Sequence, residues 1–190
     1  IEIKKGKHYA IIGKSGTGKS TLFDLLLGIL DPDEGNIFFN GLNIKEDQLR
    51  NYYHTQIAYV PQKPIILNES FKDNITLGKD ISQNEDHFYR VIKSVKLESF
   101  INSNSIDFVC GEDGINLSGG QKQRLAIARA LYSQKSILFL DECTSAVDNE
   151  TENFILDEIK YFYFDKTVIS ITHNINQLNR YDLIIDLENV

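Results

Sequence analysis

The sequence predicts an α/β fold in which a mostly parallel β-sheet is flanked by helices. Four short apolar runs recur along the chain, each of strand length and each ending at a polar residue or a glycine. Continuous β-branched and aromatic runs are typical of strands buried on both faces of a parallel sheet, and helical spacing between them supplies the covering layers. The expected strands are 8–13, 56–62, 136–142 and 167–173, the expected helices are 19–30, 119–132 and 150–161, and a hairpin is expected over 35–44 around Asn40-Gly41.

Length and charge limit the classes of protein that need to be considered. The 190 residues suit one domain that buries about 70% of its unfolded surface. A net charge of −7 argues against a sequence-independent nucleic-acid binder, which needs a basic face. Cys110 and Cys143 lack the spacing of a zinc site or a disulfide framework. The most apolar stretch, 21–30, is far shorter than the roughly 20 residues that span a bilayer.

The middle of the chain differs from its two ends. Helical spacing occurs over 84–97, and 103–116 is rich in turn residues. We therefore expect a helical subdomain inserted into the sheet. The expected division is a catalytic core of 1–62 and 136–190 and a helical subdomain of about 63–135.

Each of the four expected strands ends in a polar group or a glycine. The carboxyl ends of parallel strands lie at one edge of the sheet, where open α/β sheets bind ligands. We therefore expect these groups to converge on one site. They are Gly13, Gln62, Asp141 with Glu142, and His173.

The stretch "GKSGTGKST" at 13–21 matches G-x-x-x-x-G-K-[ST] at every fixed position and lies between an expected strand and an expected helix. Its glycines let the backbone wrap around phosphates, Lys19 supplies a point charge, and the hydroxyl of Ser20 can reach Mg²⁺. A glycine-rich turn that binds nothing is the alternative, and the flanking elements argue against it. The motif predicts a P-loop NTPase whose nucleotide-binding residues are Gly13, Lys14, Ser15, Gly16, Thr17, Gly18, Lys19, Ser20 and Thr21.

The strand "SILFLDE" at 136–142 ends in two carboxylates that complement the phosphate loop. Asp141 is expected to hold Mg²⁺ through a bound water, and Glu142 is a candidate base for the attacking water. Gln62 could coordinate Mg²⁺ or that water, and His173 could reach the γ-phosphate. Taken singly, Gln62 and His173 could equally be solvated side chains.

A second candidate phosphate site begins the helix expected over 119–132. In "LSGGQKQR", at 117–124, a Ser and two glycines precede free helix amides, which attract anions. Ser118 could cap its own helix or offer its hydroxyl to a phosphate. Behind it, Leu125, Ala128 and Leu131 have core spacing.

These motifs, in this order, resemble the nucleotide-binding domain of ATP-binding cassette (ABC) transporters over essentially the whole chain. The resemblance rests on Walker A, the Q-loop "YVPQ", the signature "LSGGQ", Walker B "ILFLDE", the D-loop "SAVD" and a switch histidine. It implies that Glu142 is the general base, that His173 contacts the γ-phosphate, and that Gln62 links the nucleotide to a membrane domain.

The resemblance also implies a head-to-tail pair of domains, in which the signature of one caps the ATP held by Walker A of the other. The substrate is then ATP with Mg²⁺. The implied residues are Leu117, Ser118, Gly119, Gly120 and Gln121 for the trans nucleotide site, Ser145, Ala146 and Asp148 for the D-loop contact between domains, and Ser20, Gln62 and Asp141 for the metal.

Two stretches resemble the exporter branch of this family. Gly111 and Glu112 match part of the T-x-V-G-E-x-G loop, although Asp107 or Phe108 replaces its Thr, and "FKDNITLG" at 71–78 resembles the exporter helical subdomain. The resemblance implies ATP-driven export or flipping across a membrane. It also implies an identical second domain, a transmembrane domain in the same polypeptide, no nucleic-acid partner, and a place on the cytoplasmic face of a membrane, expected to be a bacterial inner membrane.

The family's adenine-stacking aromatic residue, found before Walker A, has no counterpart here. Together with a first residue, Ile1, that is not Met, this suggests a domain truncated at its N-terminal side, and truncation is also expected at the C-terminus. One alternative is a soluble ABC ATPase of DNA repair, chromosome organisation or translation, but no coiled coil, second cassette or basic surface supports it. Another is a regulatory module without hydrolysis, against which the complete pair Glu142 and His173 argues.

Overall fold

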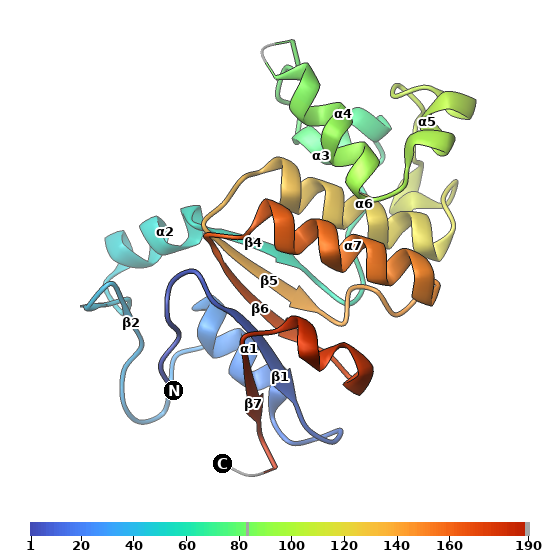
Figure 1. Ribbon diagram of the computed structural model, residues 1–190. Helices are drawn as coiled ribbons and strands as arrows, with labels where there is room; N and C mark the ends of the chain where they lie inside the picture. The colour runs from blue at the N-terminus through green and yellow to red at the C-terminus, as the bar shows by residue number, and fades with distance from the viewer. Residues whose placement is uncertain (83, 189–190) are drawn as a thin grey trace.

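A five-stranded parallel sheet forms the centre of the computed structural model, which describes residues 1–82 and 84–188 (Figure 1). The strand order is β4-β5-β6-β1-β7, and every pairing between neighbours is parallel. The four strands predicted from the sequence are confirmed. They are β1 (His8–Ile12), β4 (Ile57–Val60), β5 (Ile137–Asp141) and β6 (Thr167–Ile171). The fifth strand, β7 (Leu183–Asp186), was not predicted.

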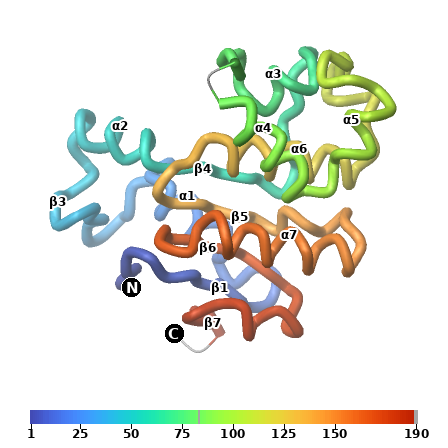
Figure 2. Tube along the Cα trace, turned by 45° about the horizontal axis from the view of Figure 1, so that its top comes forward, coloured from blue at the N-terminus to red at the C-terminus, as the bar shows by residue number. Residues whose placement is uncertain are grey.

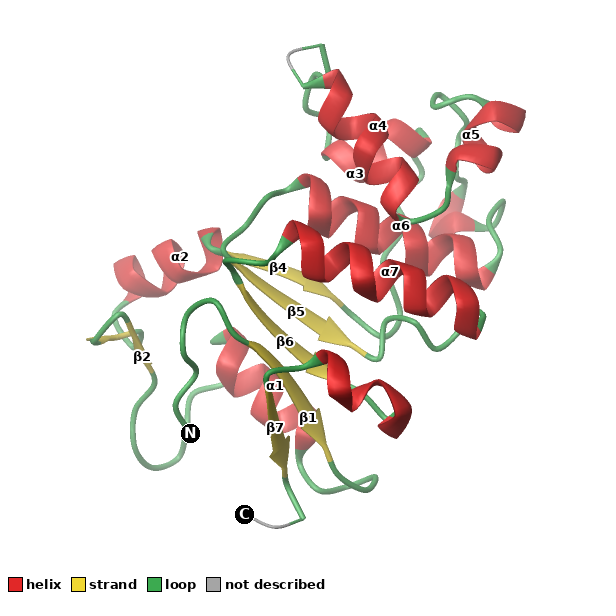
Figure 3. Cartoon of the chain, viewed as in Figure 1, coloured by secondary structure: helices red, strands yellow, loops and turns green. Residues whose placement is uncertain are grey.

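Two helical layers cover the sheet, one on each face (Figure 3). Helix α1 (Lys19–Leu27) packs Phe23 and Leu27 into a cluster with side chains of β1, β5 and β6. On the other face lie α6 (Gly119–Tyr132) and α7 (Asn149–Phe162), which match the helices predicted there. The expected core side chains of α6, Leu125, Ala128 and Leu131, are fully buried.

Helix α1 ends three residues before the predicted boundary at 30. Gly28 adopts a left-handed φ of 72°, and the amide of Ile29 turns back to the carbonyl of Asp24. This is the usual glycine stop of a helix, in which the reversed backbone satisfies the last free carbonyls. The apolar residues after it, Ile29 and Leu30, are exposed rather than helical core.

Between β4 and β5 the chain builds a group of short helices that stand together beside α6 (Figure 2). Arg129 of α6 connects this group to α6. Its guanidinium donates to the carbonyl oxygen of Asn74 at 2.6 Å and to the side-chain oxygen of Asn74 at 3.1 Å. It also donates to the carbonyl oxygen of Ile65 at 3.0 Å. The helices are α3 (Phe71–Thr76), α4 (Glu85–Ser94), α5 (Glu98–Asn104) and the 3₁₀ turn η1 (Glu112–Gly114).

The predicted hairpin is confirmed as β2 (Phe38–Phe39) and β3 (Leu42–Asn43), an antiparallel pair that turns through Asn40 and Gly41 at φ of 52° and 80°. Phe39 packs against Tyr53 of α2 (Asp47–Thr55), with ring centroids 4.9 Å apart. A last 3₁₀ segment, η2 (Ile175–Arg180), precedes β7. Among the described residues, no helix is long and apolar enough to span a membrane.

Candidate functional site

The phosphate loop follows β1, the strand between β6 and β7, and leads into α1. Gly16 and Gly18 have φ of 84° and 90°, a region that side chains with a Cβ avoid. A Cβ on Gly13 would lie 2.7 Å from Oγ1 of Thr17, so this position also needs glycine. The loop therefore has the close-approach backbone that a phosphate cradle requires.

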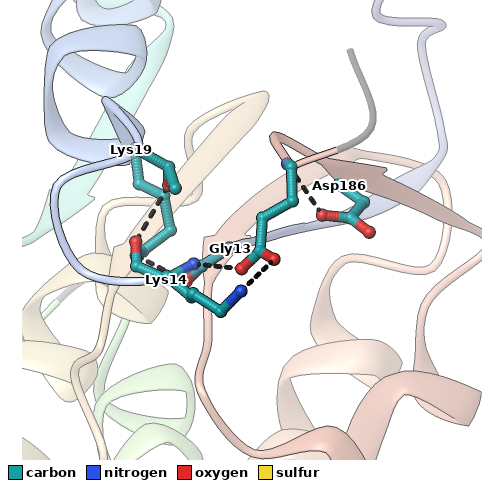
Figure 4. Close-up of polar contacts among 6 residues, drawn as sticks. Gly13, Lys14, Lys19 and Asp186 are labelled. Atoms are coloured by element: carbon teal, nitrogen blue, oxygen red, sulfur yellow. Dashed lines mark hydrogen bonds and ion pairs between the residues drawn. The ribbon is translucent and has the colours of Figure 1, made fainter.

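Lys19 lies inside this loop. Its ammonium donates hydrogen bonds to the carbonyl oxygens of Gly13 and Lys14, each at 2.8 Å (Figure 4). The residue is only 7% exposed. The charge is thus held at the centre of the loop, while Ser15, Ser20 and Thr21 are exposed around it.

A carboxylate from the chain after β7 contacts the same loop. Glu188 accepts a hydrogen bond from the backbone amide of Lys14 at 2.8 Å and forms an ion pair with its ammonium at 2.9 Å. The amide of Glu188 in turn donates to Asp186 at 3.0 Å (Figure 4). Because the strand order places β7 beside β1, this contact joins the ends of two neighbouring strands.

Glu142 has side-chain partners from two other loops. Its Oε2 accepts a hydrogen bond from Nε2 of Gln62 at 2.8 Å, and its Oε1 lies 2.7 Å from Nε2 of His173. Gln62 follows β4 and His173 follows β6, which are the strands on either side of β5. The convergence predicted from the parallel strand ends is confirmed for these three side chains.

The backbone at Glu142 is strained. Its φ of 44° is uncommon for a residue other than glycine, and such strain is maintained only where the surroundings fix it. The amide of Glu142 donates to the carbonyl of Ile171 in β6 at 3.2 Å, which holds the turn in place. The carboxylate is thereby aimed at the edge where Gln62 and His173 lie.

Asp141 adjoins this carboxylate in a partly buried position. Burial raises the pKa of Asp141, and the negative charge of Glu142 raises it further. Tyr59 donates a weak hydrogen bond to Asp141 at 3.4 Å. The pKa of Tyr59 is raised to about 12, mainly by burial and next by the negative charge of Asp141. The negative charges of these two adjacent carboxylates repel each other. A divalent cation bound beside them would relieve that repulsion.

The signature segment forms the capped start of α6. Oγ of Ser118 accepts from the amide of Gln121 at 3.3 Å, and the amide of Ser118 donates to Oε1 of Gln121 at 2.7 Å. This reciprocal pair is a capping box, so the expectation that Ser118 can cap its own helix is confirmed. The hydroxyl uses its oxygen as an acceptor there and keeps its proton available for another group. Leu117 before the cap is buried.

The D-loop packs against the first turns of α6. A Cβ on Gly120 would lie 3.0 Å from the carbonyl oxygen of Ala146, so the two backbones are close. The buried side chain of Gln123 donates to Oγ of Ser145 at 3.0 Å and accepts from the amide of Ala146 at 2.8 Å. Asp148 then caps α7 by accepting from the amide of Thr151 at 3.0 Å.

Within the described residues, no hydrogen bond or ion pair joins the signature residues 117–121 to the phosphate loop 13–21. The two candidate phosphate sites of the chain are therefore separate. Further residues that contact the loops of the site could not be predicted from the sequence, because their position depends on the tertiary fold. They are Tyr59, Gln123, Thr144, Glu152, Asn174 and Glu188.

A glycine-rich loop with a buried lysine follows β1, and an acid pair flanked by Gln62 and His173 follows β5. Together these features define the class of P-loop nucleotide-hydrolysing domains. A family model described as ABC transporter matches residues 1–145. The chain belongs to the ABC transporter family, and the P-loop fold predicted for it is confirmed.

The similar proteins are ABC transporters and a flippase, and the matching solved structure is that of an exporter. The chain is 37% identical over 188 residues to an ATP-dependent lipid A-core flippase of Alcanivorax borkumensis, covering 98% of the chain and 32% of that protein. It is 42% identical over 179 residues to ABC transporter B family member 1 of Dictyostelium discoideum, covering 93% and 19%. The solved structure of a bacterial Atm1-family ABC exporter with ATP bound superposes with a TM-score of 0.89 at 34% identity, covering 98% of this chain and 33% of that one. The chain thus spans about a third or less of these relatives, and the predicted resemblance to exporters is confirmed.

Proposed function

We propose that this chain binds and hydrolyses ATP and thereby powers export or flipping of a substrate across a membrane. One observation carries the proposal: both oxygens of Glu142 have polar partners, Gln62 and His173, at the edge of the sheet that also carries the phosphate loop. A carboxylate oriented in this way can take a proton from an attacking water. The exporter relatives support the transport part of the proposal.

Lys19 is the proposed phosphate ligand. Its ammonium is paired only with carbonyl oxygens of the loop among the described residues, at 2.8 Å each, so an incoming phosphate offers it a stronger, charged acceptor. The nucleotide would lie along residues 13–21, over the free amides that begin α1. The wrapped backbone of Gly16 and Gly18 supports close contact with the phosphates.

Mg²⁺ fits the donor set that the site presents. Asp141, whose pKa is raised by burial and then by the negative charge of Glu142, would hold the ion through a water, and Ser20 and Gln62 offer neutral oxygens. When bound, the ion would neutralise charge on the phosphates. In the proposed hydrolysis Glu142 accepts the proton of water, while His173 orients that carboxylate and contacts the γ-phosphate.

The separation of the signature from the phosphate loop supports a head-to-tail pair. Residues 117–121 would cap the ATP of a second copy, with the spare proton of Ser118 directed to its γ-phosphate, and the D-loop residues Ser145, Ala146 and Asp148 would lie between the copies. The chain would lie on the cytoplasmic face of the membrane, and its helical subdomain, about 63–135, together with Gln62, would transmit closure to a transmembrane domain. A soluble ABC ATPase is not favoured, because the similar proteins include a flippase and an exporter.

The test uses two variants of the full-length protein, Lys19→Ala and Ser118→Asp, each carrying a different affinity tag. Each variant alone should lose hydrolysis. In a co-expressed mixed pair purified through both tags, one site carries both defects and the other carries none, so hydrolysis should return to about half of the wild-type rate. A mixed pair as inactive as its parents would contradict the shared site, and wild-type protein without Mg²⁺-dependent ATPase activity would contradict the function itself.

A further inference from the structure

We infer that Glu152 is a positioning residue for hydrolysis, which holds the loop that carries Glu142 and the loop that carries His173 in register. The inference rests on the proposed function, because it concerns how the proposed catalytic pair is aligned. Glu152 lies in the first turn of α7 and is only 8% exposed. It belongs to none of the six sequence motifs.

The carboxylate of Glu152 contacts both loops at once. Its Oε1 accepts a hydrogen bond from Oγ1 of Thr144 at 2.5 Å, and its Oε2 accepts one from Nδ2 of Asn174 at 3.4 Å. Thr144 is two residues beyond Glu142, and Asn174 directly follows His173. The two loops are therefore joined twice, once by the contact between His173 and Glu142 and once through Glu152.

Packing alone does not join these loops. An open pocket of about 290 Å³ borders both loops, and its lining includes Glu142, Thr144, Glu152, His173 and Asn174. Where side chains do not fill the space, polar contacts set the relative position of the two backbones. The bridge through Glu152 crosses such a region.

The orientation of the bridge is fixed at its Asn174 end. Oδ1 of Asn174 accepts from the backbone amide of Asn176 at 3.2 Å, which leaves its Nδ2 to face Glu152. A buried carboxylate without donors would be costly, so Glu152 gains stability only when both loops present theirs. The arrangement in which Thr144 and Asn174 both donate to Glu152 is therefore the stable one.

Glu152 has no hydrogen bond to the phosphate loop among the described residues, and its partners lie on the loops after β5 and β6. Loosening the bridge should therefore misplace Glu142 relative to His173 without weakening the hold on ATP. Misplacement of a reacting group by about 1 Å can lower a rate about 100-fold. The expected signature is a fall in kcat with an unchanged dissociation constant for ATP.

The test is a polarity exchange in the full-length protein. Glu152→Gln puts an amide group against the amide of Asn174, and Asn174→Asp puts a second carboxylate against Glu152. Each single variant should lower kcat by about 10-fold to 100-fold. The double variant E152Q/N174D reverses donor and acceptor, keeps the contact to the amide of Asn176, and should recover most of kcat.

Recovery in the double variant separates positioning from a general loss of structure, and the dissociation constant for ATP and the melting temperature are measured beside kcat for every variant. Thr144→Val and Asn174→Ala, which keep the carboxylate and remove one donor each, provide milder variants if Glu152→Gln fails to fold. Full kcat in both of them, full kcat in a folded E152Q protein, or no recovery in the double variant would overturn the inference. Absence of hydrolysis in the wild type would instead remove the proposed function.

Discussion

The imidazole Nε2 of His173 lies 2.7 Å from Oε1 of Glu142, and this contact joins the ends of two adjacent parallel strands. The backbone of Glu142 has a strained φ of 44°. Both this backbone conformation and the contact with His173 therefore determine the direction of the side chain. The other carboxylate oxygen is held by Gln62. A carboxylate with both oxygens engaged in this way is already oriented in the free protein.

Replacing His173 should impair hydrolysis more than ATP binding. His173→Ala removes the partner of Oε1, and we expect kcat to fall by about 100-fold or more, the usual range for a lost acid-base partner, with ATP affinity within a few-fold of the wild type. Steady-state ATPase assays and equilibrium nucleotide binding measure the two effects. His173→Gln, which retains a donor, serves as the matched control and should lose less. An unchanged kcat in His173→Ala would show that the contact with Glu142 does not matter for catalysis.

The helix cap made by Ser118 and its proposed role as ligand of a partner's nucleotide can be separated by two substitutions. Ser118→Ala removes the cap on α6 and should lower the free energy of unfolding by about 1 kcal/mol. Ser118→Asp keeps a capping oxygen, so its stability should match the wild type, but its charge would repel a γ-phosphate and abolish hydrolysis. Denaturant unfolding and ATPase assays provide the readouts. If Ser118→Asp hydrolyses ATP normally, the signature does not contact the phosphates.

Glu188 places a negative charge on the rim of the phosphate loop, against both the amide and the ammonium of Lys14. Glu188→Gln removes the charge and retains an acceptor for the amide. Because the contact is exposed, we expect a small effect, an ATP affinity about twofold tighter at low salt. Titration of nucleotide at two ionic strengths measures it, and the gain should shrink as salt is added. A weaker affinity in this variant would mean that Glu188 supports the loop rather than competing with phosphate.

The stability of the folded chain should depend on pH through His87. Burial lowers the pKa of His87 from its ordinary value of 6.5, and the charges of Arg90 and Lys166 lower it further. The stabilisation from His87 is therefore present above pH 6.5 and is lost as the pH falls, since the unfolded chain takes up the proton first. The melting temperature should fall less between about pH 8 and about pH 5 in a His87→Gln variant than in the wild type. Equal falls would contradict the assignment.

Most of the sheet could be predicted because its strands carry continuous apolar runs. Strand β7 was missed, since it lies at the edge of the sheet and its Leu183 and Ile184 are about half exposed. Helix α2 was missed for a related reason: it is polar and buries only Tyr53. Elements that bury little leave a weak pattern in the sequence, and their place is set by neighbours distant in the chain.

In the site, too, some residues could be predicted from the sequence and others could not. Gln62, Glu142 and His173 each follow a strand of a parallel sheet, so their convergence could be predicted without knowledge of any contact. Glu152 and Gln123 lie in the first turns of helices, where a polar side chain usually faces water. Their contacts exist only because α6 and α7 pack beside the loops after β5 and β6.

In the proposed pair of domains, Gln123 would couple the two ATP sites. It fixes the D-loop, which begins three residues after Glu142, to the helix whose first turn carries the signature. In the proposed pair, Glu142 serves the ATP of its own copy, while the signature serves the ATP of the other. A displacement at the first site would then be carried by Gln123 to the second. ATP occupancy of the two sites should therefore be thermodynamically linked, with a Hill coefficient different from one.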